Sequence, residues 1–223
     1  MFAIALSWTF VYVDSILQRR RAERLIADLK SFPFAIAGFN EVRELVARNR
    51  GSIQHPPQTM SSDCPSRDCN FRIEINHPLI PLPLEGYIGQ FEYEALVYAG
   101  IRPWGVRADF FIKEGKLSET ATGIGQIYLE KTWSGKTIPA GREYRVFTAS
   151  NGINNGGHPG YTVIKPHVTG DGEILETWAA QKAGVPMDRV FDVHLRCFTS
   201  ILHGCRDFSE LAPSAWADHE RQN

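Results

Sequence analysis

The chain has 223 residues, of which 43% are hydrophobic and 22% are charged, and its formal net charge is −1. This composition is typical of a globular protein and excludes the disordered and fibrous classes. A near-neutral chain also gives no support for nucleic-acid binding, which favours a basic domain or stripe. One dense basic cluster occurs, formed by Arg19, Arg20, Arg21 and Arg24. Because this cluster follows an apolar segment, we expect membrane lipid, and no nucleic acid, as its partner.

The first thirteen residues, 1–13, contain no charged side chain and predict an apolar helix. A helix of this length spans roughly 20 Å, which is short of the ~30 Å hydrocarbon core of a bilayer. Because the basic cluster follows, we interpret residues 1–30 as an uncleaved single-pass membrane anchor that continues into a basic stalk helix. Two alternatives are a buried helix of a soluble fold and a signal peptide. A signal peptide is disfavoured because the segment lacks a basic start and the small residues of a cleavage site.

Residues 31–223 predict a single α+β domain. Helices are expected over 40–51 and from about residue 207. Strand patterns dominate between them, connections are mostly short, and no βαβ alternation occurs. We therefore expect a mainly antiparallel sheet of six or seven strands with a few packing helices. The pair Glu114-Gly115 is a turn signal that predicts a hairpin. The candidate strands are 71–76, 105–113, 116–129, 142–148, 161–168, 173–180 and 190–197.

The four cysteines form two local pairs, Cys64 with Cys69 and Cys197 with Cys205. A polar turn within the first pair and a glycine reversal within the second would each bring two Cα atoms within the ~4.4–6.8 Å that a disulfide needs. We therefore expect two structural disulfides. They imply an oxidising compartment and an extracytoplasmic, periplasmic globular part, whereas the basic cluster beside the anchor favours the opposite orientation.

A zinc site built from His194, Cys197, His203 and Cys205 is the alternative interpretation of the second cysteine pair. Apolar and polar residues alternate strictly over 191–197, which predicts a strand. In a strand, His194 and Cys197 would face opposite sides of the sheet and could not share one ion. We therefore expect no metal and no cofactor.

No familiar catalytic motif occurs in the sequence. The residues support one enzyme hypothesis, a thiol site in which His203, His158 or His219 would assist Cys205. The segment 151–160 is rich in glycine and asparagine and could close over a ligand. Its candidate binding side chains are Asn151, Asn154, Asn155 and His158. We expect a non-catalytic cell-envelope domain with a binding or structural role, and an envelope thiol enzyme is the alternative.

The features that carry a resemblance are the apolar segment, the arginine-rich helix, Cys-x4-Cys before a strand, and a C-terminal segment running through Cys197-Phe198-Thr199, Gly204-Cys205 and Leu211-Ala212-Pro213-Ser214-Ala215-Trp216. In this order they resemble uncharacterised bacterial membrane-anchored proteins, over most of the chain. The resemblance implies a membrane-anchored location and an α+β fold. It implies no activity.

Overall fold

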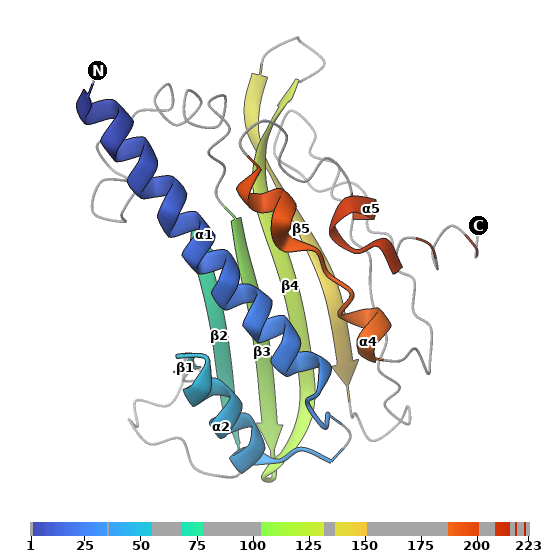
Figure 1. The fold of residues 1–223 in the computed structure, drawn as a ribbon. Helices are drawn as coiled ribbons and strands as arrows, with labels where there is room; N and C mark the ends of the chain where they lie inside the picture. The colour runs from blue at the N-terminus through green and yellow to red at the C-terminus, as the bar shows by residue number, and fades with distance from the viewer. Residues whose placement is uncertain are drawn as a thin grey trace.

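The protein is an antiparallel sheet with helices packed against one face, as the computed structural model in Figure 1 shows. The structure describes residues 2–34, 36–54, 68–77, 104–131, 137–150, 187–200, 208–214, 217 and 221. Five strands stand in the sheet in chain order, and each pairs antiparallel with the next. They are β1 (Ser52–Gln54), β2 (Cys69–His77), β3 (Trp104–Lys113), β4 (Lys116–Lys131) and β5 (Thr137–Ser150).

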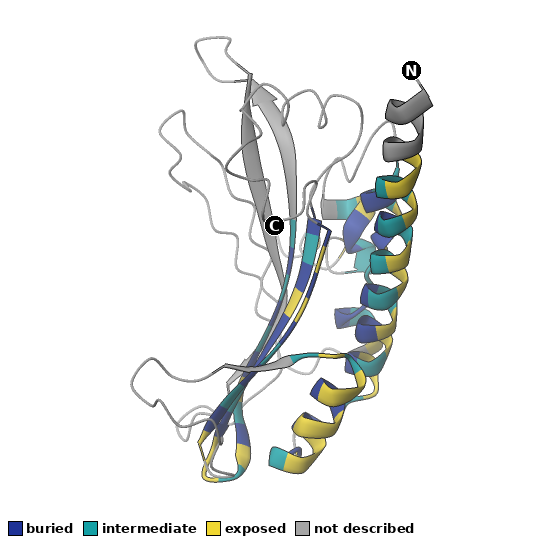
Figure 2. Ribbon diagram, turned by 90° about the vertical axis from the view of Figure 1, so that its left-hand side faces the viewer, coloured by how far each residue is buried: buried dark blue, intermediate teal, exposed yellow. Residues whose placement is uncertain are grey.

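One long helix dominates the helical layer. Figure 2 shows it on the same side of the sheet as the second helix, with its exposed side turned away from the strands. Within the described residues, the helical elements are α1 (Phe2–Lys30), α2 (Phe39–Arg48), α4 (Met187–Val190), the 3-10 helix η2 (Leu195–Thr199) and α5 (Phe208–Leu211).

Alternating burial explains the sheet. In β2, Phe71, Ile73 and Ile75 are buried, whereas Glu74 and Asn76 between and beyond them are exposed. Successive side chains of a strand point to opposite faces, so one face of β2 is apolar and is covered by the helices. The apolar face is continuous with that of β3, since the register places buried residues of the two strands opposite one another.

The predicted hairpin at Glu114-Gly115 is present between β3 and β4. Glu114 has φ 54° and Gly115 has φ 78°, so both turn residues are left-handed. Two such residues are what a two-residue type I′ turn requires, because its twist matches that of the flanking strands. The backbone N–H of Glu114 also donates to Asp68 Oδ1, just before β2, at 3.1 Å.

The prediction of six or seven strands is wrong, because the described part of the chain forms five. The expected strand 190–197 is instead the end of α4, an extended segment and the start of η2. Of its alternating apolar residues, Phe191 and Leu195 are buried in the core and Val193 and Cys197 are half-buried, although the segment is not a strand; the ring of Phe191 stacks on that of Phe34, with centroids 6.3 Å apart. The expected strands 161–168 and 173–180 lie outside the described residues.

The second half of α1 belongs to the hydrophobic core. Ala22, Leu25, Ile26 and Leu29 are all buried, at the 3–4-residue spacing that places side chains on one face of a helix. This face contacts β2, α4 and η2. The segment expected to be a stalk therefore packs in the core through an apolar face that the spacing of its residues indicates.

None of the helices in the described part of the chain is both long enough and apolar enough to cross a membrane. The prediction of a single-pass transmembrane anchor is therefore wrong. Its physical reason lies in the sequence, since the uncharged run ends at Asp14 after thirteen residues and polar side chains follow in every turn.

A histidine and a tryptophan fasten the middle of α1 to the sheet. His77, at the end of β2, lies 3.1 Å from the backbone oxygen of Val11 through its Nε2. Trp104, which pairs with His77 in the sheet, donates its Nε1–H to Ser15 Oγ at 3.1 Å. The indole also stacks on Phe198 of η2, with ring centroids 5.2 Å apart. These contacts join α1, β2, β3 and η2 at one point.

Burial lowers the pKa of His77 from its ordinary value of 6.5, and the nearby carboxylate of Asp14 opposes this shift. The folded protein therefore favours the neutral imidazole, and unfolding takes up a proton. Stability from this group is fully present above pH 6.5 and is lost as the pH falls through the lowered pKa. We expect the melting temperature of the wild type to drop between pH 7.5 and 5 more than that of His77→Gln. Equal drops in the two proteins would contradict a neutral buried His77.

Candidate anion-binding site

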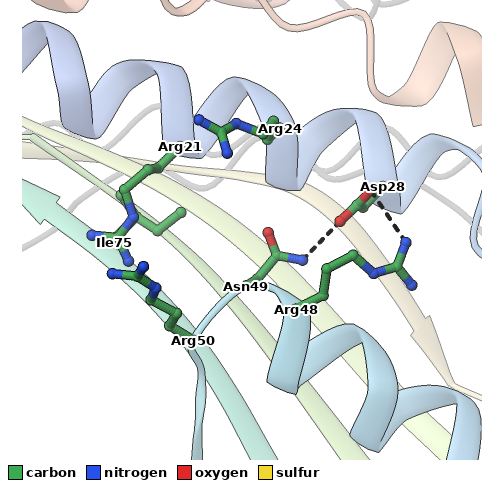
Figure 3. A pocket seen from close by; sticks show the side chains of 7 residues that line it. All are labelled: Arg21, Arg24, Asp28, Arg48, Asn49, Arg50 and Ile75. Carbon is green, nitrogen blue, oxygen red and sulfur yellow. Dashed lines mark hydrogen bonds and ion pairs between the residues drawn. The ribbon is translucent and has the colours of Figure 1, made fainter.

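A pocket with a volume of about 300 Å³ lies between α1, the end of α2 and β2. Arg21, Arg24 and Asp28 of α1 reach it because spacings of three and four residues share one helix face. Figure 3 shows the arginine side chains of α1 and of the end of α2, together with Ile75 of β2. The lining side chains are Arg21, Arg24, Asp28, Arg48, Asn49, Arg50 and Ile75.

The turn that ends α2 positions three of these side chains. Gly51 N–H donates to Val46 O at 2.8 Å, and Arg50 N–H donates to Ala47 O at 3.2 Å. This pair of bonds is the Schellman motif, in which the residue after the C-cap adopts a left-handed conformation and is usually glycine. Here that residue is Arg50, with φ 55°. A left-handed non-glycine residue costs about 1–2 kcal/mol, so the fold accepts strain to place a guanidinium at the pocket.

The glycine of this turn stands one residue later, where close packing requires it. A Cβ atom on Gly51 would lie 2.7 Å from Arg72 O of β2 and 2.9 Å from side-chain carbons of Ile73 and Val46. No side chain fits at that position without moving the strand or the helix. The glycine of this turn therefore stands where α2 approaches β2 closely, and the left-handed position is occupied by Arg50.

A single carboxylate of the pocket holds the two helices together. Asp28 Oδ2 accepts from Asn49 Nδ2 at 2.8 Å, and Asp28 Oδ1 lies 3.7 Å from Arg48 Nη1. Asn49 Nδ2 also donates to Leu45 O at 3.1 Å, which fixes the orientation of the amide. Both oxygens of Asp28 are thus engaged with the end of α2, and Figure 3 draws both contacts.

The other three arginines of the pocket have no carboxylate partner among the described residues. Arg21 donates to the neutral amide of Gln18 at 2.8 Å. Uncompensated guanidinium groups that line one pocket repel one another, and an anion between them removes that repulsion. With four arginines and one carboxylate among its lining residues, the pocket is electropositive.

A different arrangement on β2 and β3 shows what a structural charge cluster looks like in the same protein. Asp109 is buried and accepts at 2.7 Å from Arg72 Nε and, through its other oxygen, from Arg107 Nε. Its backbone oxygen accepts from Thr120 Oγ1 at 2.9 Å. Here one buried carboxylate ties neighbouring strands together, whereas the pocket presents its cations around open space.

The structure divides the basic cluster that the sequence predicted. Arg21 and Arg24 line the pocket, and Arg20 is exposed elsewhere on α1. Arg19 points to η2, where it donates to Thr199 Oγ1, and it also pairs with Glu23 at 3.3 Å. The four arginines do not form one patch, because consecutive residues of a helix face different directions.

The predicted disulfides are not seen as bonds between two described cysteines. Cys69 begins β2 and is buried, Cys197 lies half-buried in η2, and neither is a free thiol. Both described cysteines are disulfide-bonded, but Cys64 and Cys205 lie outside the described residues, so the structure does not describe the predicted pairing. The zinc alternative also needs His203 and Cys205, which lie outside the described residues. Of its other two members, His194 contacts Asp192 at 3.2 Å, and no group of three metal-ligating side chains occurs in the described residues.

The remaining predicted site residues cannot be placed. The candidate ligand segment with Asn151, Asn154, Asn155 and His158 lies outside the described residues, as do His203 and His219 of the thiol hypothesis. The residues that sequence reasoning missed are Asp28, Arg48, Asn49, Arg50 and Ile75. The sequence does contain a signal for Arg48, Asn49 and Arg50, because two arginines directly before the helix-ending Gly51 make an unusually basic turn.

Comparisons with protein-family models, with curated proteins and with solved structures find no match to this chain. The resemblance stated above therefore stays an expectation, and function is argued from the pocket alone.

Proposed function

We propose that the protein binds a compact, multiply charged anion in the pocket between α1 and α2, and that a diphosphate group fits it best. The observation that carries the proposal is the convergence of Arg21, Arg24 and Arg50 on one cavity without a carboxylate partner among the described residues. Arginine forms paired, planar hydrogen bonds to phosphate oxygens and stays charged at every physiological pH.

The size of the pocket supports a small ligand. A cavity of about 300 Å³ stands at the lower end of the range for small-molecule sites. Adjacent phosphate groups concentrate several charges in such a volume, which a single carboxylate does not. Ile75 forms an apolar wall beside the charged groups, so an organic substituent on the phosphate would also find a surface to contact.

The lining supports binding more than catalysis. It contains no histidine, cysteine, serine or threonine among its seven residues. Arginine and asparagine orient and neutralise an anion, but neither transfers a proton near neutral pH. The one carboxylate of the lining, Asp28, is engaged with Asn49 and Arg48. A binding role is therefore favoured over the envelope thiol enzyme, for which the described residues offer no free thiol.

Calorimetric titration with inorganic pyrophosphate tests the proposal. Arg21→Gln removes one guanidinium and its charged hydrogen bonds, and we expect the Kd to rise at least about tenfold. Arg20→Gln is the matched control, since it removes the same charge from the adjacent, exposed position of the same helix. We expect its Kd to stay within about twofold of wild type. Equal weakening by both substitutions would mean that overall charge, and not this pocket, holds the anion.

A further inference from the structure

Part of β2 forms an unpaired edge of the sheet next to the arginine pocket. β1 pairs with β2 at Asn70, Phe71 and Arg72, and within the described residues no strand continues this pairing along 73–77. An unpaired strand edge presents a row of backbone N–H and C=O groups, which is a template for pairing with another chain. Ile75, which lies in this unpaired stretch, also lines the pocket.

The backbone groups of Glu74 and Asn76 point outward from this edge. A Cβ atom on Gly51, directly before β1, would lie 2.7 Å from Arg72 O, so the carbonyl of Arg72 points to the β1 side. In an antiparallel ladder the hydrogen-bonding groups of successive residues point to opposite sides, and the register of β2 with β3 is regular over 69–77. Glu74 and Asn76 therefore point the same way as Arg72, and each offers one N–H donor and one C=O acceptor.

A strand added at this edge would direct one of its side chains into the pocket. Directly opposite residues of two paired strands lie on the same face of the sheet, with Cβ atoms about 4.5–5.5 Å apart. A residue added opposite Ile75 therefore has its side chain on the face of Ile75, and Arg21 and Arg50 line the same pocket as Ile75 (Figure 3). The positions opposite Glu74 and Asn76 face the other side of the sheet.

We propose that the anion of the pocket is carried by an extended phosphorylated peptide, which adds to the edge of β2 at residues 74–76 and places its phosphate among Arg21, Arg24 and Arg50. This inference rests on the proposed function and names the partner class of the same site. Strand addition at a sheet edge and phosphate recognition by arginine clusters are both recurring modes of peptide binding. Here the backbone of β2 supplies the first and the pocket supplies the second.

Phosphate suits the pocket better than an acidic side chain does. Gly51 stands against Ile73, and His77 contacts Val11 of α1, which leaves the position opposite Ile75 to face the pocket. The negative charge of the peptide must therefore be concentrated on one side chain. A phosphorylated side chain carries a charge of about −1.5 to −2 near neutral pH and three acceptor oxygens, whereas a carboxylate carries a single charge.

Calorimetric titration of the full chain tests the proposal with a capped peptide of alternating threonine and valine that has one phosphoserine at its centre. We expect its Kd for the wild type to be at least about tenfold lower than that of capped phosphoserine alone, because the backbone pairing adds hydrogen bonds. The unphosphorylated peptide should not bind measurably. This comparison uses the wild type only and does not depend on the folding of any variant.

A pair of variants tests the strand edge itself. Asn76→Pro removes an outward N–H, which an edge strand tolerates, and should abolish the advantage of the peptide over capped phosphoserine. Asn76→Ala retains that N–H and is the matched control, which should bind the peptide as the wild type does. Both variants should bind pyrophosphate with the wild-type Kd, since Asn76 does not line the pocket.

Three results would overturn the proposal. The first is an equal Kd of the phosphorylated peptide and capped phosphoserine for the wild type. The second is an equal Kd of that peptide for Asn76→Pro and Asn76→Ala, and the third is equally tight binding of the unphosphorylated peptide. Pyrophosphate binding without any gain from the peptide would overturn this inference alone, whereas no binding of pyrophosphate, phosphoserine or peptide would overturn the proposed function as well.

Discussion

Replacing Leu25 and Leu29 together by alanine is expected to leave the protein largely unfolded. Both side chains are fully buried between α1 and the sheet. Each buried leucine-to-alanine change costs about 2–5 kcal/mol, from lost apolar burial and the cavity left behind. Two such changes approach the entire stability of a typical domain, about 5–15 kcal/mol. Urea unfolding followed by circular dichroism measures the effect.

Leu17→Ala is the matched control for that experiment. It removes the same atoms from the same helix at a position that is half exposed, and we expect its free energy of unfolding to lie within about 0.5 kcal/mol of wild type. If the double variant were as stable as this control, α1 would be a detached stalk, and the core described for the protein would be incorrect.

Reversing the charge at position 50 is expected to have the largest effect on anion binding. Arg50→Glu removes a guanidinium from the pocket and places a carboxylate where the anion must sit. Loss of charged hydrogen bonds and the added repulsion together should raise the Kd for pyrophosphate about hundredfold or more. Arg43→Glu makes the same change in net charge on the exposed side of α2 and should leave binding within a few-fold of wild type. A similar loss in both variants would show that the effect is long-range and not local to the pocket.

The hairpin and β2 can be predicted from neighbouring residues alone, because two-residue turns and alternating burial are local patterns. The pair Glu114-Gly115 predicts the hairpin, and the alternation around Ile73 predicts the strand. The mistaken strand at 191–197 shows the limit, since its alternating apolar residues lie in or against the core although the segment is not a strand. A short alternation does not distinguish a sheet from an irregular segment that packs against a core.

The N-terminal helix was anticipated, but its environment was not. The absence of charge in residues 1–13 indicates a lipid environment, whereas the helical spacing of Leu25, Ile26 and Leu29 indicates a protein core, and these three residues are buried in the core. Whether an apolar face meets lipid or protein depends on contacts with distant residues such as His77 and Trp104. No local pattern in the sequence contains that information.

Only part of the pocket lining can be predicted from the sequence. Arg21 and Arg24 belonged to a recognised basic cluster, whereas Arg50 joins them only because α2 folds back beside α1. The end of α2 was expected at Gly51, close to its observed end at Arg48. That the left-handed residue would be Arg50 could not be foreseen, because it follows from the contact between Gly51 and the backbone of β2.

Thermal unfolding of wild type and Arg50→Gly, each with and without pyrophosphate, tests most directly that this turn holds its arginine for an anion. Without ligand, Arg50→Gly should be the more stable protein by about 1 kcal/mol, because glycine adopts the left-handed conformation without strain. Pyrophosphate at about 100 times the wild-type Kd should stabilise the wild type by about 2.7 kcal/mol and the variant far less. If pyrophosphate left the wild type unchanged, or stabilised both proteins equally, the pocket would not be an anion-binding site.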